Sequence, residues 1–137
     1  MEYFVIKIIL LSLLILLPVA SYAKDKLEKG ELIYQDNYLK LYADDPIKEF
    51  DNKIRKNVLR VRAIIDEISS ENYKIVFFLF DCKGKSVSSV TDSILINKQT
   101  NKFSTGLGNV NYNSRTYSPV FLGKSASSIY FKHACKI

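Results

Sequence analysis

Hydrophobic and polar positions alternate along much of this chain, with the period of two that half-buried β-strands show. The clearest example spans residues 57–68, where Val61, Ala63 and Ile65 would share one face and charged side chains the other. Residues 73–82 are different, because their long apolar run leaves no polar face. We therefore expect residues 73–82 to form a central strand that is covered above and below.

Shorter strand candidates flank these two segments and are separated by turn residues. We expect them at residues 31–35, 38–42, 86–97 and 102–112. In the last of these, Gly106 and Gly108 would permit a bulge or a bend. The polar segment 44–57 is interrupted by Pro46, so we expect a long loop or a short helix there.

The C-terminal segment changes to the spacing of a helix. Between residues 124 and 135, the apolar positions that recur at this spacing are Ala126, Ile129, Tyr130 and Ala134. Ser125 precedes them and is suited to cap the first turn. The pattern as a whole predicts an α+β fold, an antiparallel meander of five to six strands with a C-terminal helix on the sheet.

The N-terminal segment has the features of a signal peptide. Residues 8–20 are almost entirely apolar, but they fall short of the ~20 residues that a membrane-spanning helix needs. Ser21 and Ala23 supply small residues at the −3 and −1 positions of a cleavage site. We therefore expect a signal peptide, residues 1–23, and a single exported domain, residues 24–137, in the periplasm, at the cell surface or secreted. An uncleaved N-terminal anchor is the alternative. We expect no lipid anchor, because there is no cysteine near the junction.

The 137 residues include two cysteines, Cys82 and Cys135, which we expect to form a disulfide in an exported chain. Cys82 ends the expected central strand and Cys135 ends the expected helix, so the bond would strap the helix to the sheet. The chain-entropy model assigns about 4 kcal/mol of stabilisation to a loop of this length. A redox or metal-binding role is the alternative, but the CxxC spacing typical of such sites is missing.

The formal net charge is +6, and it is concentrated in the second half of the chain. Residues 82–137 contain eight basic residues and a single acidic one, Asp92. This distribution favours an anionic partner, whereas a charge of this size is too small to indicate a nucleic-acid-binding protein. The basic residues that we expect to make contacts are Lys83, Lys85, Lys98, Lys102 and Arg115, which are interleaved with tyrosine and phenylalanine. The alternative is that these cations only keep the turns soluble.

The sequence offers little catalytic chemistry. His133 is the single histidine, which excludes a two-histidine nuclease, and no phosphate-binding glycine loop, serine elbow or zinc-ligand spacing is present. The acidic residues Asp44, Asp45, Glu49 and Asp51 lack the spacing and the glycine of an EF-hand loop. We therefore expect a protein that is not an enzyme and that holds no metal or cofactor. A small hydrolase remains an alternative, which would require this acidic segment to bind a metal.

Several of these segments together resemble the surface-adhesin protein E family of small exported bacterial proteins. The matching positions are residues 58–66, residues 73–82 with the terminal Asp81-Cys82, Tyr117-Ser118-Pro119 through Gly123, Ser125, and Cys135-Lys136. The resemblance covers roughly residues 31–137. It implies a six-stranded antiparallel sheet with a C-terminal helix tethered by a disulfide, and adhesion to host matrix proteins such as vitronectin or laminin.

The sequence and the resemblance together suggest an exported bacterial binding protein. We expect it to be adhesin-like and to contact host matrix glycoproteins, or another anionic surface, through its basic and aromatic side chains. The alternative is a periplasmic structural or inhibitory protein that binds another protein of the bacterial envelope. Exposed sheet edges would also allow a homodimer.

Overall fold

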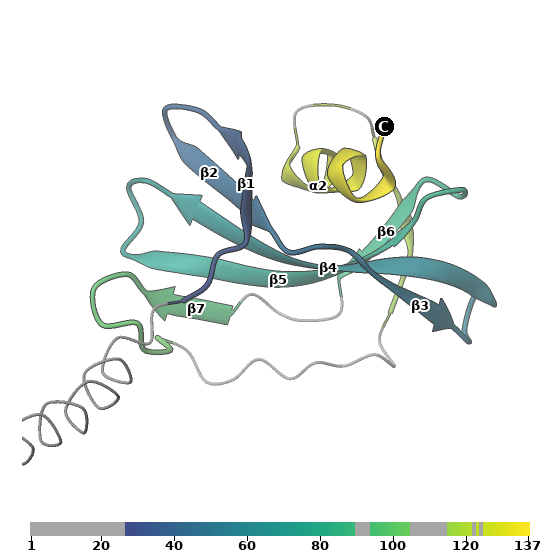
Figure 1. The fold of residues 1–137 in the computed structure, drawn as a ribbon, viewed down its shortest axis with the longest axis horizontal. Coiled ribbons are helices and arrows are strands. Elements are labelled where there is room, and N and C mark those ends of the chain that lie inside the picture. The colour runs from purple at the N-terminus through teal and green to yellow at the C-terminus, as the bar shows by residue number, and fades with distance from the viewer. Residues whose placement is uncertain (1–26, 90–93, 105–114, 122, 124) are drawn as a thin grey trace, which may run out of the picture.

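The computed structural model describes residues 27–89, 94–104, 115–121, 123 and 125–137. In these residues, eight strands form one antiparallel sheet, and a single helix packs against one of its faces (Figure 1). In chain order the elements are β1 (Glu31–Gln35), β2 (Leu39–Ala43), β3 (Ile47–Asp51), β4 (Lys56–Glu67), β5 (Asn72–Asp81), β6 (Ser86–Ser89), β7 (Ile94–Asn97), β8 (Ser118–Pro119) and α2 (Ala126–Cys135). None of the described residues belongs to a helix long and apolar enough to cross a membrane. The expected signal peptide lies outside the described residues.

The eight strands occupy six positions across the sheet, because two positions are each shared by two strands. β2 and β3 lie end to end along one side of β4, and β6 and β7 lie in the same way along β5. The mainly antiparallel sheet with a C-terminal helix confirms the expected architecture, but the expected count of five to six strands is wrong. One reason is that segment 86–97, expected to be one strand, is divided into β6 and β7. Residues 90–93 between them lie outside the description.

The second reason is that segment 44–57 contains β3, so the expectation of a loop or a short helix there is wrong. β3 pairs along its whole length with the first half of β4, and residues 52–55 form the connecting turn. Pro46 stands immediately before the strand, where its missing N–H interrupts no ladder hydrogen bond. Arg55 completes the turn with a left-handed φ of 53°.

β5 is covered on both faces, which agrees with the expectation that residues 73–82 form a central strand. On the helix side, Phe80, Tyr130 and Phe131 are fully buried, and the rings of Phe80 and Phe131 meet edge-on at 5.8 Å. On the other side, Ile64 packs against isoleucines of β5 and β7. The hydroxyl of Tyr130 donates to the carbonyl oxygens of Tyr42 (3.0 Å) and Ile64 (3.1 Å), so the one polar atom of this buried ring is satisfied.

The C-terminal helix is fixed at both ends. At its N-terminus, the side-chain oxygen of Ser125 accepts the N–H of Ser128 at 3.3 Å, which confirms Ser125 as the cap. At its C-terminus, a disulfide joins Cys135 to Cys82, with 5.6 Å between the Cα atoms, and Lys136 adopts a left-handed φ of 53°. The expected disulfide is therefore confirmed, and it straps α2 to the end of β5.

Only the start of the expected strand 102–112 falls within the described residues. There, Phe103 forms a single β-bridge with Ile96 of β7. Gly106 and Gly108, which we expected to permit a bulge, lie outside the description.

Candidate functional site

A groove on the helix side of the sheet follows from the register of β3, β4 and β5. Pairing places Lys48 opposite Leu59 and Leu59 opposite Phe80, so these side chains form a row across the three strands. Phe50 lies opposite Asn57 in the neighbouring row. Since residues directly opposite each other share a face of the sheet, all five side chains lie on the face that carries α2.

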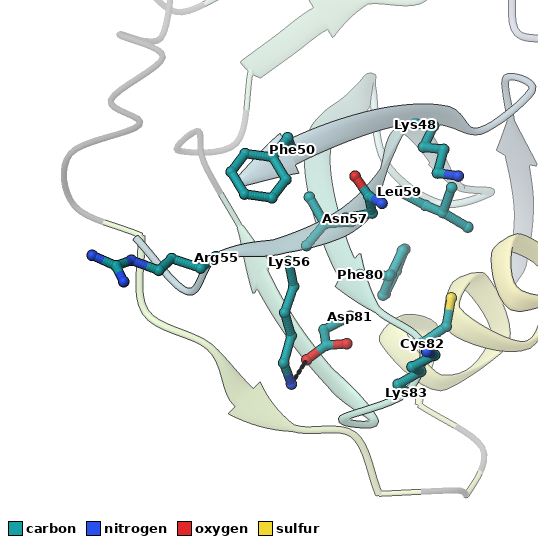
Figure 2. Close-up of a pocket in the computed structure, with 11 residues that line it drawn as sticks. Lys48, Phe50, Arg55, Lys56, Asn57, Leu59, Phe80, Asp81, Cys82 and Lys83 are labelled. Carbon is teal, nitrogen blue, oxygen red and sulfur yellow. Dashed lines mark hydrogen bonds and ion pairs between the residues drawn. The ribbon is translucent and has the colours of Figure 1, made fainter. Parts of the chain in front are cut away.

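The groove has a volume of about 600 Å³, and Figure 2 shows the side chains that line it. Its floor is apolar, because Phe80 is fully buried and Leu59 is half-buried against the same core. Phe50 forms an open aromatic wall with 61% of its surface exposed. On the opposite face of the same strand, Ile47 is 52% exposed, whereas Asp51 at the end of the strand is buried.

Four basic residues are among those that line the groove, and we call the site the basic groove: Lys48, Arg55, Lys56 and Lys83. The acidic residue of the lining is Asp81, whose carboxylate lies 3.2 Å from the Lys56 ammonium. In the part of the chain that the structure describes, Lys48, Arg55 and Lys83 have no carboxylate partner. The basic groove therefore carries a positive charge that no carboxylate of the described residues neutralises, apart from the Lys56–Asp81 pair.

Asp81 also shapes the turn that carries Lys83. Its side chain is almost fully buried and accepts the backbone N–H of Gly84 at 3.0 Å in addition to the Lys56 ammonium. A Cβ atom at Gly84 would collide with the Asp81 carboxylate, which would have to shift from its hydrogen bonds. Lys85 follows with a left-handed φ of 49°, which turns the chain into β6.

On the other face of the sheet, Asp51 ties the end of β3 to residues 115–117. Its side chain is 2% exposed and accepts hydrogen bonds from the Arg115 guanidinium (2.9 Å), the Tyr117 hydroxyl (2.6 Å) and the backbone N–H of Lys53 (2.8 Å). Burial by itself would raise the pKa of Asp51, but these hydrogen bonds and the Arg115 charge hold that pKa below its ordinary value. Burial, together with the bond to Asp51, raises the pKa of Tyr117.

The five basic residues that we expected to make contacts do not form one surface. Lys83 and Lys85 share the β5–β6 turn beside the basic groove. Lys98 and Lys102 follow β7, which pairs with the opposite end of β5. Arg115 is mostly buried in its ion pair with Asp51, its side chain being 14% exposed.

Lys98 is also engaged within the fold. Its ammonium lies 2.6 Å from the Asp66 carboxylate and donates to the carbonyl oxygen of Glu67 at 2.8 Å. The same ammonium lies 5.5 Å from the centre of the Tyr73 ring. Lys98 therefore contributes its charge to contacts that stabilise the sheet.

Sequence reasoning missed most of the basic groove. Lys48, Phe50, Arg55 and Lys56 fall in the segment that we expected to be a loop or a short helix. Lys48 and Phe50 are two positions apart, as side chains on one face of a strand are. That spacing was the available signal, and Pro46 obscured it.

The acidic residues of segment 44–51 do not converge on one point. Asp44 lies 2.6 Å from the Arg62 guanidinium and Glu49 lies 3.2 Å from that of Arg60. Within the described residues, no group of three or more histidine, cysteine, aspartate and glutamate side chains is arranged to hold a metal ion. His133 lies in the last turn of α2.

Comparison of the chain with family models, with curated proteins and with solved structures finds no match. The resemblance to the surface-adhesin protein E family therefore stays a prediction.

Proposed function

We propose that this protein is an exported, adhesin-like binding protein that holds an anionic protein partner in the basic groove, with host matrix glycoproteins as the partner class. The observation that carries the proposal is the gathering of three cations without a carboxylate partner around one apolar floor, an arrangement that the ion-paired cations of the sheet do not show. Arg60, Arg62, Lys98 and Arg115 each face a carboxylate. By contrast, three cations of the groove surround an apolar floor with no carboxylate partner among the described residues.

This combination of charge and apolar area suits protein recognition. Unpaired cations attract an anionic partner over a distance and select it against a cationic one. Exposed Phe50 and half-buried Leu59 supply apolar area that a partner would remove from water. Charge alone would give weak and salt-sensitive binding, so the apolar floor is what would add affinity.

The proposal is tested with a triple variant of the groove, Lys48→Gln, Arg55→Asn and Lys83→Gln. Asparagine is used at position 55 because it tolerates the left-handed φ of 53°. We expect binding to immobilised vitronectin or laminin to weaken about tenfold and to depend less on salt, since each exposed ion pair contributes up to about 1 kcal/mol.

The matched control removes three other lysines, by Lys40→Gln, Lys102→Gln and Lys132→Gln. It lowers the net charge equally but leaves the groove intact, so we expect binding close to that of the unmodified protein. If both triple variants bind alike, net charge explains the interaction and the groove does not.

A periplasmic partner is the alternative to a host glycoprotein, because the groove selects an anionic partner whatever its cellular source. Antibody labelling of intact and permeabilised cells, with a known periplasmic protein as control, separates the two. Labelling of intact cells would support the adhesin-like role. Labelling only after permeabilisation would favour a structural or inhibitory protein that binds another envelope protein.

A further inference from the structure

We infer that the partner enters the basic groove as an extended acidic segment, which pairs with the outer edge of β3 and adds an antiparallel strand to the sheet. This inference rests on the proposed function, which it makes more specific. Figure 2 shows Lys48 and Phe50 on β3 along the groove, so this strand forms one wall of the groove.

The outer edge of β3 has no strand beside it among the described residues, because β3 pairs only with β4. Two hydrogen bonds give the direction of the β4 backbone. The N–H of Ile68 donates to the carbonyl oxygen of Tyr38, and the carbonyl oxygen of Arg62 accepts from Asp44. Even-numbered residues of β4 therefore direct their backbone groups toward β2 and β3, and odd-numbered residues direct theirs toward β5.

This alternation determines which backbone groups of β3 point outward. Lys48 and Phe50 lie opposite Leu59 and Asn57, which are odd-numbered residues of β4. Backbone groups of Lys48 and Phe50 therefore point away from β4, toward solvent at the edge. An added antiparallel strand would form hydrogen-bonded pairs with these two residues.

Two other edges of the sheet, those of β1 and β8, are less suited to strand addition. The ladder of β1 with β2 is irregular between Leu32 and Tyr34, and such irregularities blunt an edge. β8 is two residues long and includes Pro119, which has no N–H to donate. β3 is five residues long and regularly paired.

The face of the groove gives the expected sequence of the added strand. Partner residues opposite Lys48 and Phe50 would point into the groove. This favours a carboxylate opposite Lys48 and an aromatic side chain opposite Phe50. The residue between them would lie on the other face, beside Glu49, which already pairs with Arg60. A carboxylate is disfavoured there, so we expect acidic and aromatic residues to alternate with uncharged ones.

The probe for this inference is a fluorescent synthetic peptide containing Asp-Thr-Phe-Thr-Asp, titrated against the purified exported protein. In one derivative the amide nitrogens of Phe and of the last Asp are methylated. These residues would lie opposite Phe50 and Lys48, so methylation removes the N–H groups that would face β3. In the matched derivative the amide nitrogens of the two Thr residues are methylated instead. We expect the first derivative to bind about tenfold more weakly than the parent, and the second to bind like the parent.

A second readout is amide hydrogen exchange of the protein with and without the parent peptide. We expect exchange at Lys48 and Phe50 to slow on binding, because their N–H groups become hydrogen-bonded. Exchange at Glu49, which lies opposite Val58 and directs its N–H toward β4, should change much less.

The outcomes separate this inference from the proposed function. If both methylated derivatives bind as tightly as the parent, and the groove triple variant weakens all of them, strand addition is overturned and the basic groove stands. If no peptide binds but heparin does and needs the groove, the occupant is a sulfated glycan and the inference is equally overturned. If the triple variant weakens neither peptide nor glycoprotein binding, the proposed function itself fails.

Discussion

The hydroxyl of Tyr117 donates a hydrogen bond of 2.6 Å to the carboxylate of Asp51, which lies 66 positions earlier in the chain. Asp51 is the last residue of β3, and Tyr117 directly precedes β8, so the bond joins two segments that do not pair in the sheet. Arg115 binds the same carboxylate. This contact fixes the end of β3, and with it the wall of the basic groove that carries Phe50.

Replacing Asp51 with asparagine should destabilise the protein. The change leaves the mostly buried Arg115 guanidinium without its charge partner, and breaking a buried pair from one side costs about 3 kcal/mol. The free energy of unfolding in urea measures this loss. Glu49→Gln is the control, because it breaks the more exposed pair with Arg60, and we expect a loss below about 1 kcal/mol. Equal losses in the two variants would contradict the assigned role of Asp51.

The same carboxylate should make stability depend on acidic pH. Because the folded-state pKa of Asp51 lies below its value in the unfolded chain, its stabilising effect is complete at neutral pH. The effect is lost as pH falls below the ordinary value of 3.8 and through the folded-state pKa. Between pH 7 and pH 2, the free energy of unfolding should therefore fall more steeply for the unmodified protein than for the Asp51→Asn variant. Parallel profiles would show that another acid is responsible.

Loss of the disulfide should cost several kcal/mol. Reduction, or the change Cys135→Ser, releases the end of α2 from Cys82 and restores the entropy of a long loop to the unfolded chain, which corresponds to about 4 kcal/mol. Thermal melting of the oxidised and reduced proteins measures the effect. Identical melting temperatures would show that the bond does not strap the helix to the sheet in solution.

Replacing Gly84 with alanine should distort the turn between β5 and β6, which carries Lys83 of the basic groove. The added Cβ would collide with the Asp81 carboxylate, and overpacking of this kind costs about 1–3 kcal/mol. We also expect weaker partner binding, because Lys83 is carried by the same turn. Gly123→Ala is the matched control, since its Cβ would only approach the carbonyl oxygen of Phe121 at 4.0 Å. Urea denaturation and glycoprotein binding of the two variants provide the comparison.

Local patterns in the sequence were sufficient for much of the fold. The apolar run of residues 73–82 predicts a strand covered on both faces, and the spacing around Ile129 predicts the helix that Ser125 caps. The disulfide followed from the presence of only two cysteines in a chain expected to be exported. Each of these predictions depends on residues that are close in sequence or on a single possible covalent pairing.

The basic groove could not be predicted in the same way, because β3 has little local signal of its own. Its two large apolar side chains, Ile47 and Phe50, are three positions apart and lie on opposite faces, so they do not give the alternating apolar pattern of a half-buried strand. Both are more than half exposed. β3 is held by its ladder with β4 and by the Asp51 contact with Arg115, which is 64 positions away. Neither the ladder nor so distant a pair can be deduced from spacing along the chain.

The bond between Cys82 and Cys135 also determines how the protein would respond to a mechanical pull on its two termini. Residues between the two cysteines lie in a covalently closed loop, so the tension passes through the sulfur atoms and cannot stretch that loop. Extension is confined to residues before Cys82, which include β3 and β4. Lys48 would move away with the stretched chain while Lys83 stayed in the closed loop, so force would separate the two walls of the groove and release whatever it holds.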